Sequence, residues 1–144
     1  MSTLTGKWAL ITGSSRGIGQ QIALGLARVD CNVVVHARRT KHLGTTPQLL
    51  EECRVHIHTT SGDLSTPEGI QSVVDGASSC AGPIDILYNN AAIMNEWKAV
   101  WELAAEEWLQ TFQVNRFAMV SLCNAFAPGM KRRGYGRIIN VTSG

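Results

Sequence analysis

Short apolar runs alternate with longer amphipathic stretches along the whole chain. The runs have the length of strands and cover residues 8–11, 33–35, 55–60, 84–88 and 137–141. Because most of them are apolar throughout, rather than alternating apolar with polar positions, both faces of each strand should be buried. This pattern predicts a parallel sheet with helices on each side.

The segments between these runs have helical spacing. After the first strand, an apolar stripe is formed by Ile18, Ile22, Leu26 and Val29. Thr66, followed by a proline, predicts the amino terminus of a helix over residues 66–79. A long helix is predicted from about residue 105 to residue 130, with Asn115 inside it. The order of elements predicts one doubly wound α/β domain in three layers over residues 1–144.

Composition and charge narrow the class of protein. The 144 residues are 44% hydrophobic and 17% charged, which is typical of a globular domain with a real core. The net charge of +2 is too small to indicate nucleic acid or membrane partners. No segment approaches the ~18 apolar residues of a membrane span, and no apolar signal-peptide run opens the chain. We therefore expect a cytoplasmic protein.

The cysteine and histidine positions do not predict a metal site. The four cysteines lie far apart and never form a CxxC pair, which favours free thiols in a reducing compartment. His56 and His58 would point the same way on a strand, so a metal is conceivable, but the strand over residues 55–60 offers no carboxylate or cysteine partner to complete a ligand set. We expect neither a disulfide nor a metal ion.

A glycine-rich turn joins the first strand to the first helix. It consists of Thr12, Gly13, Ser14, Ser15, Arg16, Gly17, Ile18 and Gly19. Gly13 permits a tight exit from the strand, Gly17 lets a pyrophosphate approach the backbone, and Gly19 allows the helix to pack closely on the sheet. The helix amino terminus offers free N–H groups to the anion. This position in the chain predicts dinucleotide binding, and the lack of a following Lys-Ser or Lys-Thr pair argues against a P-loop.

The spacing of these glycines is similar to TGxxxGxG, the signature of the short-chain dehydrogenase/reductase family. Later motifs follow in the family's order: Asp63 in "GDLS", residues 89–92 as "NNAA", Asn115 in "QVNRF", and Ser143 after the fifth strand. The chain therefore resembles this family over its full length. The resemblance implies a Rossmann-type fold and an oxidoreductase.

The resemblance also implies roles in cofactor binding. Asp63 would accept a hydrogen bond from the adenine amino group, assisted by the backbone of Leu64; a local turn or N-cap role is the alternative for Asp63. The adenosine side would be lined, and the central sheet braced, by Asn89, Asn90 and Ala91. Ala92 stands where the family usually has glycine, so a methyl group is added near the cofactor.

Two positions are implied to take part in catalysis. Asn115 would hold a water in a proton relay, or alternatively cap a kink, because Asn is a poor residue inside a helix. Ser143 would hydrogen-bond the oxygen of a carbonyl or alcohol substrate. In the family the proton moves through the Tyr of a Tyr-x-x-x-Lys pair, but neither Tyr88 nor Tyr135 has a Lys four residues later. We expect an amino-terminal portion, incomplete at its carboxyl end and inactive alone.

The end of the second strand bears on the choice of cofactor. It reads His36-Ala37-Arg38-Arg39, without the carboxylate that NAD-binding members use to hold the ribose 2′-hydroxyl. Arg38 can form a charge-assisted fork with a 2′-phosphate, and Arg16 can approach from the glycine-rich turn. NADP is therefore favoured over NAD, although both arginines could simply be solvated surface residues.

The implied function is hydride transfer between NADP and a small carbonyl or alcohol substrate. A non-catalytic dinucleotide-binding fragment or pseudoenzyme is the alternative. The resemblance implies a homo-oligomer, a dimer or tetramer, for the complete protein. Trp97, Trp101 and Trp108 lie roughly at helical spacings, and we expect them to pack or to form substrate-side surface.

Overall fold

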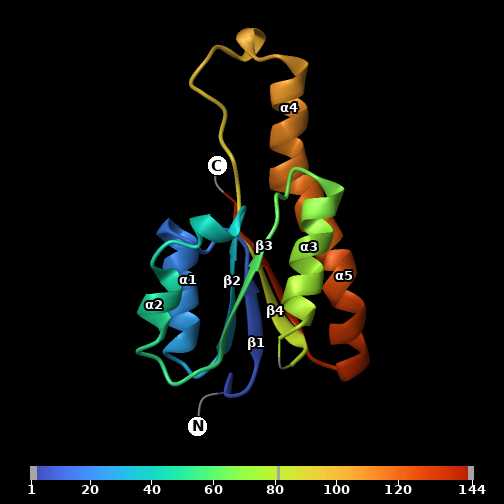
Figure 1. The fold of residues 1–144 in the computed structure, drawn as a ribbon. Helices are drawn as coiled ribbons and strands as arrows, with labels where there is room; N and C mark the ends of the chain where they lie inside the picture. The colour runs from blue at the N-terminus through green and yellow to red at the C-terminus, as the bar shows by residue number, and fades with distance from the viewer. Residues whose placement is uncertain (1–2, 81, 143–144) are drawn as a thin grey trace.

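The computed structural model describes residues 3–80 and 82–142, which form a sheet between two layers of helices (Figure 1). The strands are β1 (Trp8–Ile11), β2 (Asn32–Ala37), β3 (Ile57–Ser61), β4 (Ile84–Asn89) and β5 (Arg137–Asn140). All neighbouring strands pair in parallel, in the order β3-β2-β1-β4-β5. This arrangement confirms the predicted doubly wound, Rossmann-type α/β fold.

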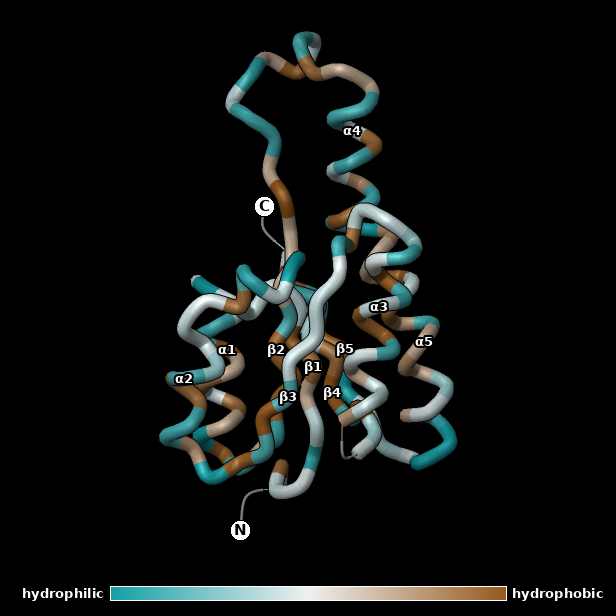
Figure 2. The backbone as a smooth tube through the Cα atoms, viewed as in Figure 1, coloured by the Kyte–Doolittle hydropathy of each residue, from teal (hydrophilic) through white to brown (hydrophobic). Residues whose placement is uncertain are grey.

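The core consists of two apolar clusters, one on each face of the sheet. Successive residues of a strand point to opposite faces. Leu10 of β1 therefore joins one cluster, together with Val73 and Leu122, whereas Ile11 joins the other with Leu24. Figure 2 shows the hydrophobic residues concentrated on the central strands and weaker along β3.

Helices cover both faces. The helical elements are α1 (Gly17–Ala27), η1 (Thr40–His42), α2 (Thr46–Leu50), α3 (Pro67–Ser78), η2 (Val100–Glu102), α4 (Ala105–Phe112), η3 (Gln113–Phe117) and α5 (Ala118–Arg133). Figure 1 shows α1 and α2 on one side of the sheet and α3 and α5 on the other. The predicted helix start at Thr66 is confirmed, since its hydroxyl accepts a hydrogen bond from the Gly69 N–H at 3.0 Å. The segment η1–α2 was not predicted.

The predicted apolar stripe of α1 is wrong at both ends. Ile18 is 67% exposed, and Val29 lies beyond the end of the helix and is 43% exposed. The buried residues of α1 are instead Gly19, Ala23, Leu24 and Ala27. Gly19, Ala23 and Ala27 are small and let the helix axis lie close to the sheet, with Leu24 as the one large side chain buried in α1.

Two further expectations differ from the structure. The long helix predicted over residues 105–130 is divided by η3, a π-helical turn, into α4 and α5. The strand β5 is not buried on both faces, because it has only one neighbouring strand within the described residues and three of its four residues are exposed. It also ends at Asn140, one residue before the predicted end.

Residues 94–112 form a projecting arm that rises from the end of β4 beyond the rest of the molecule and returns through α4 (Figure 1). Trp97 and Trp101 of this arm are 95% and 84% exposed, so the packing role considered for them is wrong, and Trp108 is exposed as well. An ion pair between Lys98 and Glu107, at 3.1 Å, links the two limbs of the arm. Among the helices of residues 3–80 and 82–142, none is long and apolar enough to cross a membrane.

Candidate functional site

The predicted cofactor residues meet at the carboxyl ends of β1, β2, β3 and β4. In parallel sheets ligands bind at this end, in the crevice outside the strands. The glycine-rich turn follows β1, Arg38 follows β2, Asp63 follows β3, and Asn90 follows β4. Residues separated by more than 70 positions in the chain are therefore neighbours here, as the Asn90–Thr12 bonds show.

Each glycine of the turn occupies a position that a side chain would disturb. Gly13 and Gly17 have φ angles of +64° and +59°, in the left-handed region that favours glycine. A Cβ on Gly13 would lie 2.9 Å from the Ala91 Cα, and a Cβ on Gly19 would lie 2.5 Å from the Asn90 Nδ2. A Cβ on Gly17 would meet nothing within 4 Å, so the space above this residue is open to a ligand.

The turn is fastened to the end of β4 by Thr12 and Asn90. The Thr12 hydroxyl accepts hydrogen bonds from the N–H groups of Asn90 and Ala91, each at 3.0 Å. In return, the Asn90 Nδ2 donates to the Thr12 carbonyl at 3.0 Å and to the Gly13 carbonyl at 3.2 Å. Both side chains are thus used to hold backbone in place.

The non-glycine residues of the turn at positions 14–18 differ in burial. Ser14 is fully buried; its hydroxyl donates to the Ile11 carbonyl at 2.7 Å and accepts from the His36 N–H at 2.9 Å. Ser15 is half-buried, whereas Arg16 and Ile18 are exposed. Arg16 precedes α1 without capping it through its side chain, and the helix has no acidic residue in its first turn. An anion can therefore approach this helix end without meeting a carboxylate.

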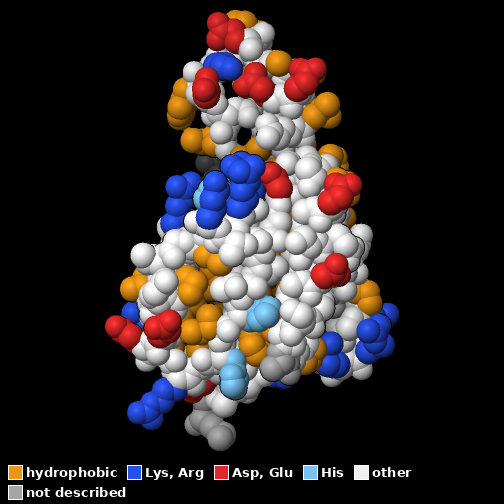
Figure 3. All heavy atoms as spheres, in the orientation of Figure 1, with side chains coloured by type: hydrophobic (Ala, Val, Ile, Leu, Met, Phe, Trp, Pro, Cys, Tyr) orange, Lys and Arg blue, Asp and Glu red, His pale blue; other side chains and the backbone are white. Residues whose placement is uncertain are grey.

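Exposed basic residues follow β2. Arg38, Arg39 and Lys41 are all exposed, and no acidic residue lies among positions 36–42. Figure 3 shows Lys and Arg side chains gathered at this end of the molecule, below the projecting arm. The area has the charge and exposure needed to bind a phosphate.

Asp63 forms a local turn with Ser65. Its Oδ1 accepts hydrogen bonds from the Ser65 N–H at 2.9 Å and from the Ser65 hydroxyl at 2.7 Å. The hydrogen bonds from Ser65 hold the pKa of Asp63 below its ordinary value. The charges of Arg38 and Arg39 act in the same direction, whereas burial acts in the opposite direction. The local turn, which was the alternative role considered for Asp63, is therefore present in the structure. It uses the Oδ1 atom of the carboxylate and not Oδ2.

Asn89 and Leu64 lie inside the molecule. The Asn89 Nδ2 donates to the Asn140 Oδ1 at 2.9 Å and so connects β4 to β5. Its buried Oδ1 has no partner among the described residues. The Leu64 side chain is buried in the core, so only its backbone is available to a ligand.

Asn115 pairs with one residue at the base of the projecting arm. Its Oδ1 accepts from the Ile93 N–H and its Nδ2 donates to the Ile93 carbonyl, both at 2.8 Å. Asn115 lies in the π-helical turn η3, so its side chain satisfies loop backbone at an irregularity of the helix. Ser143, the other predicted catalytic residue, lies outside the described residues.

Ala92 does not strain the structure. It is exposed, and Asp30 is the one non-glycine residue with a positive φ among residues 3–80 and 82–142. The methyl group that replaces the family's usual hydrogen is therefore accommodated without a left-handed backbone.

His36 is a member of the site that the sequence analysis did not identify. Its buried ring contacts the glycine-rich turn on one side and Gly62 on the other. A polar residue at the end of the otherwise apolar run 33–37 is a signal that could have drawn attention to it.

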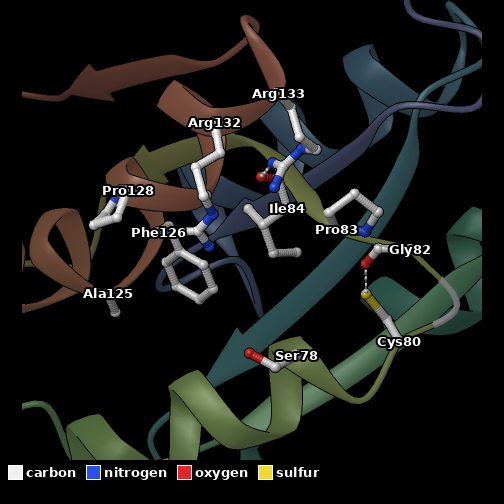
Figure 4. A pocket seen from close by; sticks show the side chains of 11 residues that line it. Ser78, Cys80, Gly82, Pro83, Ile84, Ala125, Phe126, Pro128, Arg132 and Arg133 are labelled. Carbon is white, nitrogen blue, oxygen red and sulfur yellow. Dashed lines mark hydrogen bonds between the residues drawn. The ribbon is translucent and has the colours of Figure 1, made fainter.

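A pocket of about 510 Å³ lies at the opposite end of the sheet, near the start of β4 (Figure 4). Arg133, which lines it, donates to the Ile84 carbonyl at 2.8 Å and lies 3.7 Å from the Asp85 carboxylate. This guanidinium is engaged by the protein itself, and none of the predicted cofactor residues lines the pocket. Among the described residues, no group of three or more His, Cys, Asp or Glu side chains could hold a metal ion.

Comparison with known proteins decides the family. The family model described as "short chain dehydrogenase" matches residues 7–144. The chain belongs to the short-chain dehydrogenase/reductase family. The glycine-rich turn, the Asp63–Ser65 turn and the hydrogen bonds between Thr12 and Asn90 are thus parts of a short-chain dehydrogenase/reductase.

Relatives in this family include reductases and dehydrogenases. The chain is 36% identical over 144 residues to the ketoacyl reductase HetN of Nostoc sp. strain PCC 7120, covering 99% of this chain and 50% of the relative. It is 38% identical over 144 residues to 2-dehydro-3-deoxy-D-gluconate 5-dehydrogenase of Bacillus subtilis, covering 98% of this chain and 54% of the relative. The chain thus spans about half the length of these curated relatives.

A solved structure shares the fold and contains a nucleotide. A metagenomic short-chain oxidoreductase in complex with NADP superposes with a TM-score of 0.91 at 32% identity, covering 99% of this chain and 63% of that one. The described half of the family fold is therefore close to that of an NADP-bound relative.

Proposed function

We propose that this chain is the nucleotide-binding portion of an NADP(H)-dependent oxidoreductase that acts on a small carbonyl or alcohol compound. Residues 1–144 would form its nucleotide-binding Rossmann domain. The observation that carries the proposal is the glycine-rich turn, because Gly17 has a left-handed backbone and open space above it at the amino terminus of α1.

The turn would hold the pyrophosphate. The N–H groups in the first turn of an α-helix have no intrahelical partners and attract an anion. Gly13, Gly17 and the exposed Ile18 would face the nucleotide through backbone and surface atoms, together with Ser15. Thr12, Ser14 and Asn90 would act through the backbone that they position, because their side chains are used in internal bonds.

Arg38 and Arg16 would select NADP(H) over NAD(H). Both are exposed at the edge of the turn, and no carboxylate follows β2 to repel a 2′-phosphate. Relatives crystallised with the phosphorylated cofactor support this choice, including a metagenomic oxidoreductase with NADP.

Asp63, Leu64 and Ala91 would surround the adenosine. The Asp63 Oδ2, which the bonds from Ser65 do not use, would accept from the adenine amino group. The Leu64 backbone would assist it, and Ala91 and the buried Asn89 would form and brace the floor at the end of β4.

The bound nicotinamide would supply or accept the hydride. Asn115 and Ser143 are the positions of this chain assigned to the substrate side. In this assignment the Ser143 hydroxyl would hydrogen-bond the substrate oxygen. Asn115, at the base of the projecting arm, would hold a water of the proton relay. The proton donor of the family, a Tyr-x-x-x-Lys pair, does not occur within residues 1–144. A homo-oligomer and a cytoplasmic location stay predictions.

Nucleotide titration tests the assignment. We expect NADPH to bind more tightly than NADH, and Arg38→Asp to weaken NADPH binding about tenfold or more, since a charge-assisted contact contributes ~1.5–3 kcal/mol. Arg54→Asp is the matched control, because it makes the same charge change at an exposed position before β3. Equal losses in the two variants, or equal affinities for the two nucleotides, would contradict the assignment.

A non-catalytic nucleotide-binding fragment or pseudoenzyme is the second candidate, and residues 1–144 alone contain no Tyr-x-x-x-Lys pair. General acid–base catalysis contributes ~10²–10⁴-fold, so we expect no NADPH oxidation above background by residues 1–144 with ketones, aldehydes or keto-acyl thioesters. Turnover abolished by Ser143→Ala would show that another proton donor operates.

A further inference from the structure

His36 joins two loops of the nucleotide site through one buried ring. It ends the apolar part of β2 and is 3% exposed. The Gly13 N–H donates to its Nδ1 at 3.0 Å, and its Nε2 lies 3.0 Å from the Gly62 carbonyl oxygen. The backbone of His36 adds two bonds to Ser14, one from the Ser14 N–H at 3.0 Å and one to the Ser14 hydroxyl at 2.9 Å. The residue therefore fixes the glycine-rich turn relative to the loop that carries Asp63.

These two ring contacts permit one protonation state. A backbone N–H can only donate, so Nδ1 must carry a lone pair toward Gly13. A backbone carbonyl can only accept, so Nε2 must carry the hydrogen toward Gly62. The neutral Nε2–H tautomer satisfies both, whereas an imidazolium would point a second hydrogen at the Gly13 N–H.

We propose that neutral His36 is a positioning residue for the nucleotide, holding the glycine-rich turn against the Gly62–Asp63 loop, and that its protonation releases Gly13 and weakens NADP(H) binding. The inference rests on the proposed function, in which the turn binds the pyrophosphate and Asp63 binds the adenine. Since these two groups are joined covalently in one nucleotide, the separation of the two loops affects its affinity.

The surroundings of the ring favour the neutral form. Burial lowers the pKa of His36 below its ordinary value, while the hydrogen bond to Gly62 and the negative charge of Asp63 act in the opposite direction. Asp63 is in turn influenced by Arg38 and Arg39, which lie at the end of β2. Among the described residues, Asp63 is the charged group that acts on this imidazole.

The first test needs no nucleotide. In the ¹⁵N-labelled chain, long-range ¹H–¹⁵N spectra of the imidazole should show the Nε2–H tautomer near neutral pH. On acidification, the amide signals of Gly13 and Gly62 should shift with the same midpoint as the ring, below the ordinary value of about 6.5. An Nδ1–H tautomer, or a Gly13 amide that does not follow the ring, would overturn the proposal.

The second test uses NADP⁺, which tolerates acid, and two replacements that each keep one half of the bridge. His36→Asn places a non-titrating acceptor near the Nδ1 position, and His36→Gln places a donor near the Nε2 position. We expect the Asn variant to bind NADP⁺ with an affinity that follows only the nucleotide's own titration. The wild type should lose affinity relative to it as the pH falls through the ring midpoint found in the first test, with a loss of about tenfold once the ring is protonated, because losing a hydrogen bond to a buried group costs ~1–3 kcal/mol.

The Gln variant should bind about tenfold more weakly than the wild type at pH 8, since it leaves the Gly13 N–H without its acceptor. Dispersed amide spectra establish that each variant is folded. Identical pH dependence of the wild type and the Asn variant would overturn the proposed effect on affinity. If no variant binds NADP⁺ or NADPH at any pH, the proposed function and this effect are both refuted, whereas the amide titration still decides whether the bridge exists.

Discussion

The glycine-rich turn and the projecting arm lie at the same end of the sheet but are held in different ways. The turn is fixed by internal hydrogen bonds from Thr12, Ser14 and Asn90, most of them at least partly buried. The arm contains no buried residue in α4, and its limbs are linked by the partly exposed Lys98–Glu107 ion pair and by a hydrogen bond from the Thr111 hydroxyl to the Asn95 Oδ1 at 2.8 Å. The comparison teaches that one region is fixed by a network of buried polar contacts, whereas the other depends on few contacts, one of them an exposed ion pair that solvent screens.

The largest effect should come from filling the space around Gly19. In Gly19→Ala the new methyl group would overlap the Gly13 carbonyl oxygen and press on the Asn90 side chain. We expect the free energy of unfolding to fall by up to about 3 kcal/mol, as in other overpacked sites. Urea denaturation measures the change.

Gly25 provides the matched control in the same helix. A Cβ at this position meets nothing within 4 Å, so Gly25→Ala should stabilise the chain by about 0.5–1 kcal/mol through helix propensity. If both substitutions had the same effect, the tight contact between turn and helix would not be the feature that fixes this region.

The next largest effect on the free energy of unfolding should come from the base of the projecting arm, at Asn115. Asn115→Ala removes both bonds to Ile93 and leaves the N–H and carbonyl of that residue without these partners. We expect a loss of about 2 kcal/mol, since each unmade bond to a partly buried group is costly. Hydrogen exchange should show faster exchange of the Ile93 amide, with the amides of β1 and β2 little changed. Uniform loss of protection throughout the sheet would contradict a local role.

Acidification should act on the turn region. The folded-state pKa values of His36 and Asp63 are both lowered. His36 therefore stabilises the fold above about pH 6.5, and this contribution decreases as the pH falls below that value; Asp63 loses its contribution below its ordinary pKa of about 3.9. We expect the unfolding free energy to fall between pH 7 and pH 5 with a slope of at most ~1.4 kcal/mol per pH unit from His36. The slope should disappear in His36→Asn.

The smallest effect should come from the tip of the arm. Trp97→Ser and Trp101→Ser remove side chains that are almost wholly exposed, so each should change the unfolding free energy by less than about 0.5 kcal/mol. Thermal denaturation of the two variants measures this. A destabilisation as large as that of Gly19→Ala would mean that the arm is packed against other parts of the molecule.

Local backbone requirements could be predicted from the sequence, whereas contacts between positions far apart in the chain could not. Gly13 was assigned correctly to a tight exit from β1, because its left-handed backbone is a local requirement. The bridge at His36 could not be seen, because its two partners lie 23 and 26 positions away and meet only through the order of the strands. The stripe on α1 was misjudged because Ala23 and Ala27, which are small, make the close contact that Ile18 does not.

The break in the long helix could be predicted only in part: a kink at Asn115 was one of the two alternatives for this residue, but the contact that forms there could not be predicted. Nothing in the local pattern around Asn115 shows that its amide will pair with Ile93, 22 positions earlier. The segment over residues 40–50 lacks a clear apolar period, so η1 and α2 were not expected. Long-range pairing and short helices are the features that periodicity does not report.

The π-helical turn has a geometric consequence for the whole second half of the helical segment. A π turn accommodates an additional residue relative to an α turn, and each residue of a helix advances the side-chain direction by about 100°. The register of α5 is therefore rotated by about that angle from the register a straight continuation of α4 would have. This rotation sets which side of α5 meets the sheet: the row Ala118, Leu122, Phe126 and Met130, at intervals of four residues, is the one that is buried. The five residues of η3 thus act as a phase shift between two helices that the sequence pattern alone would join.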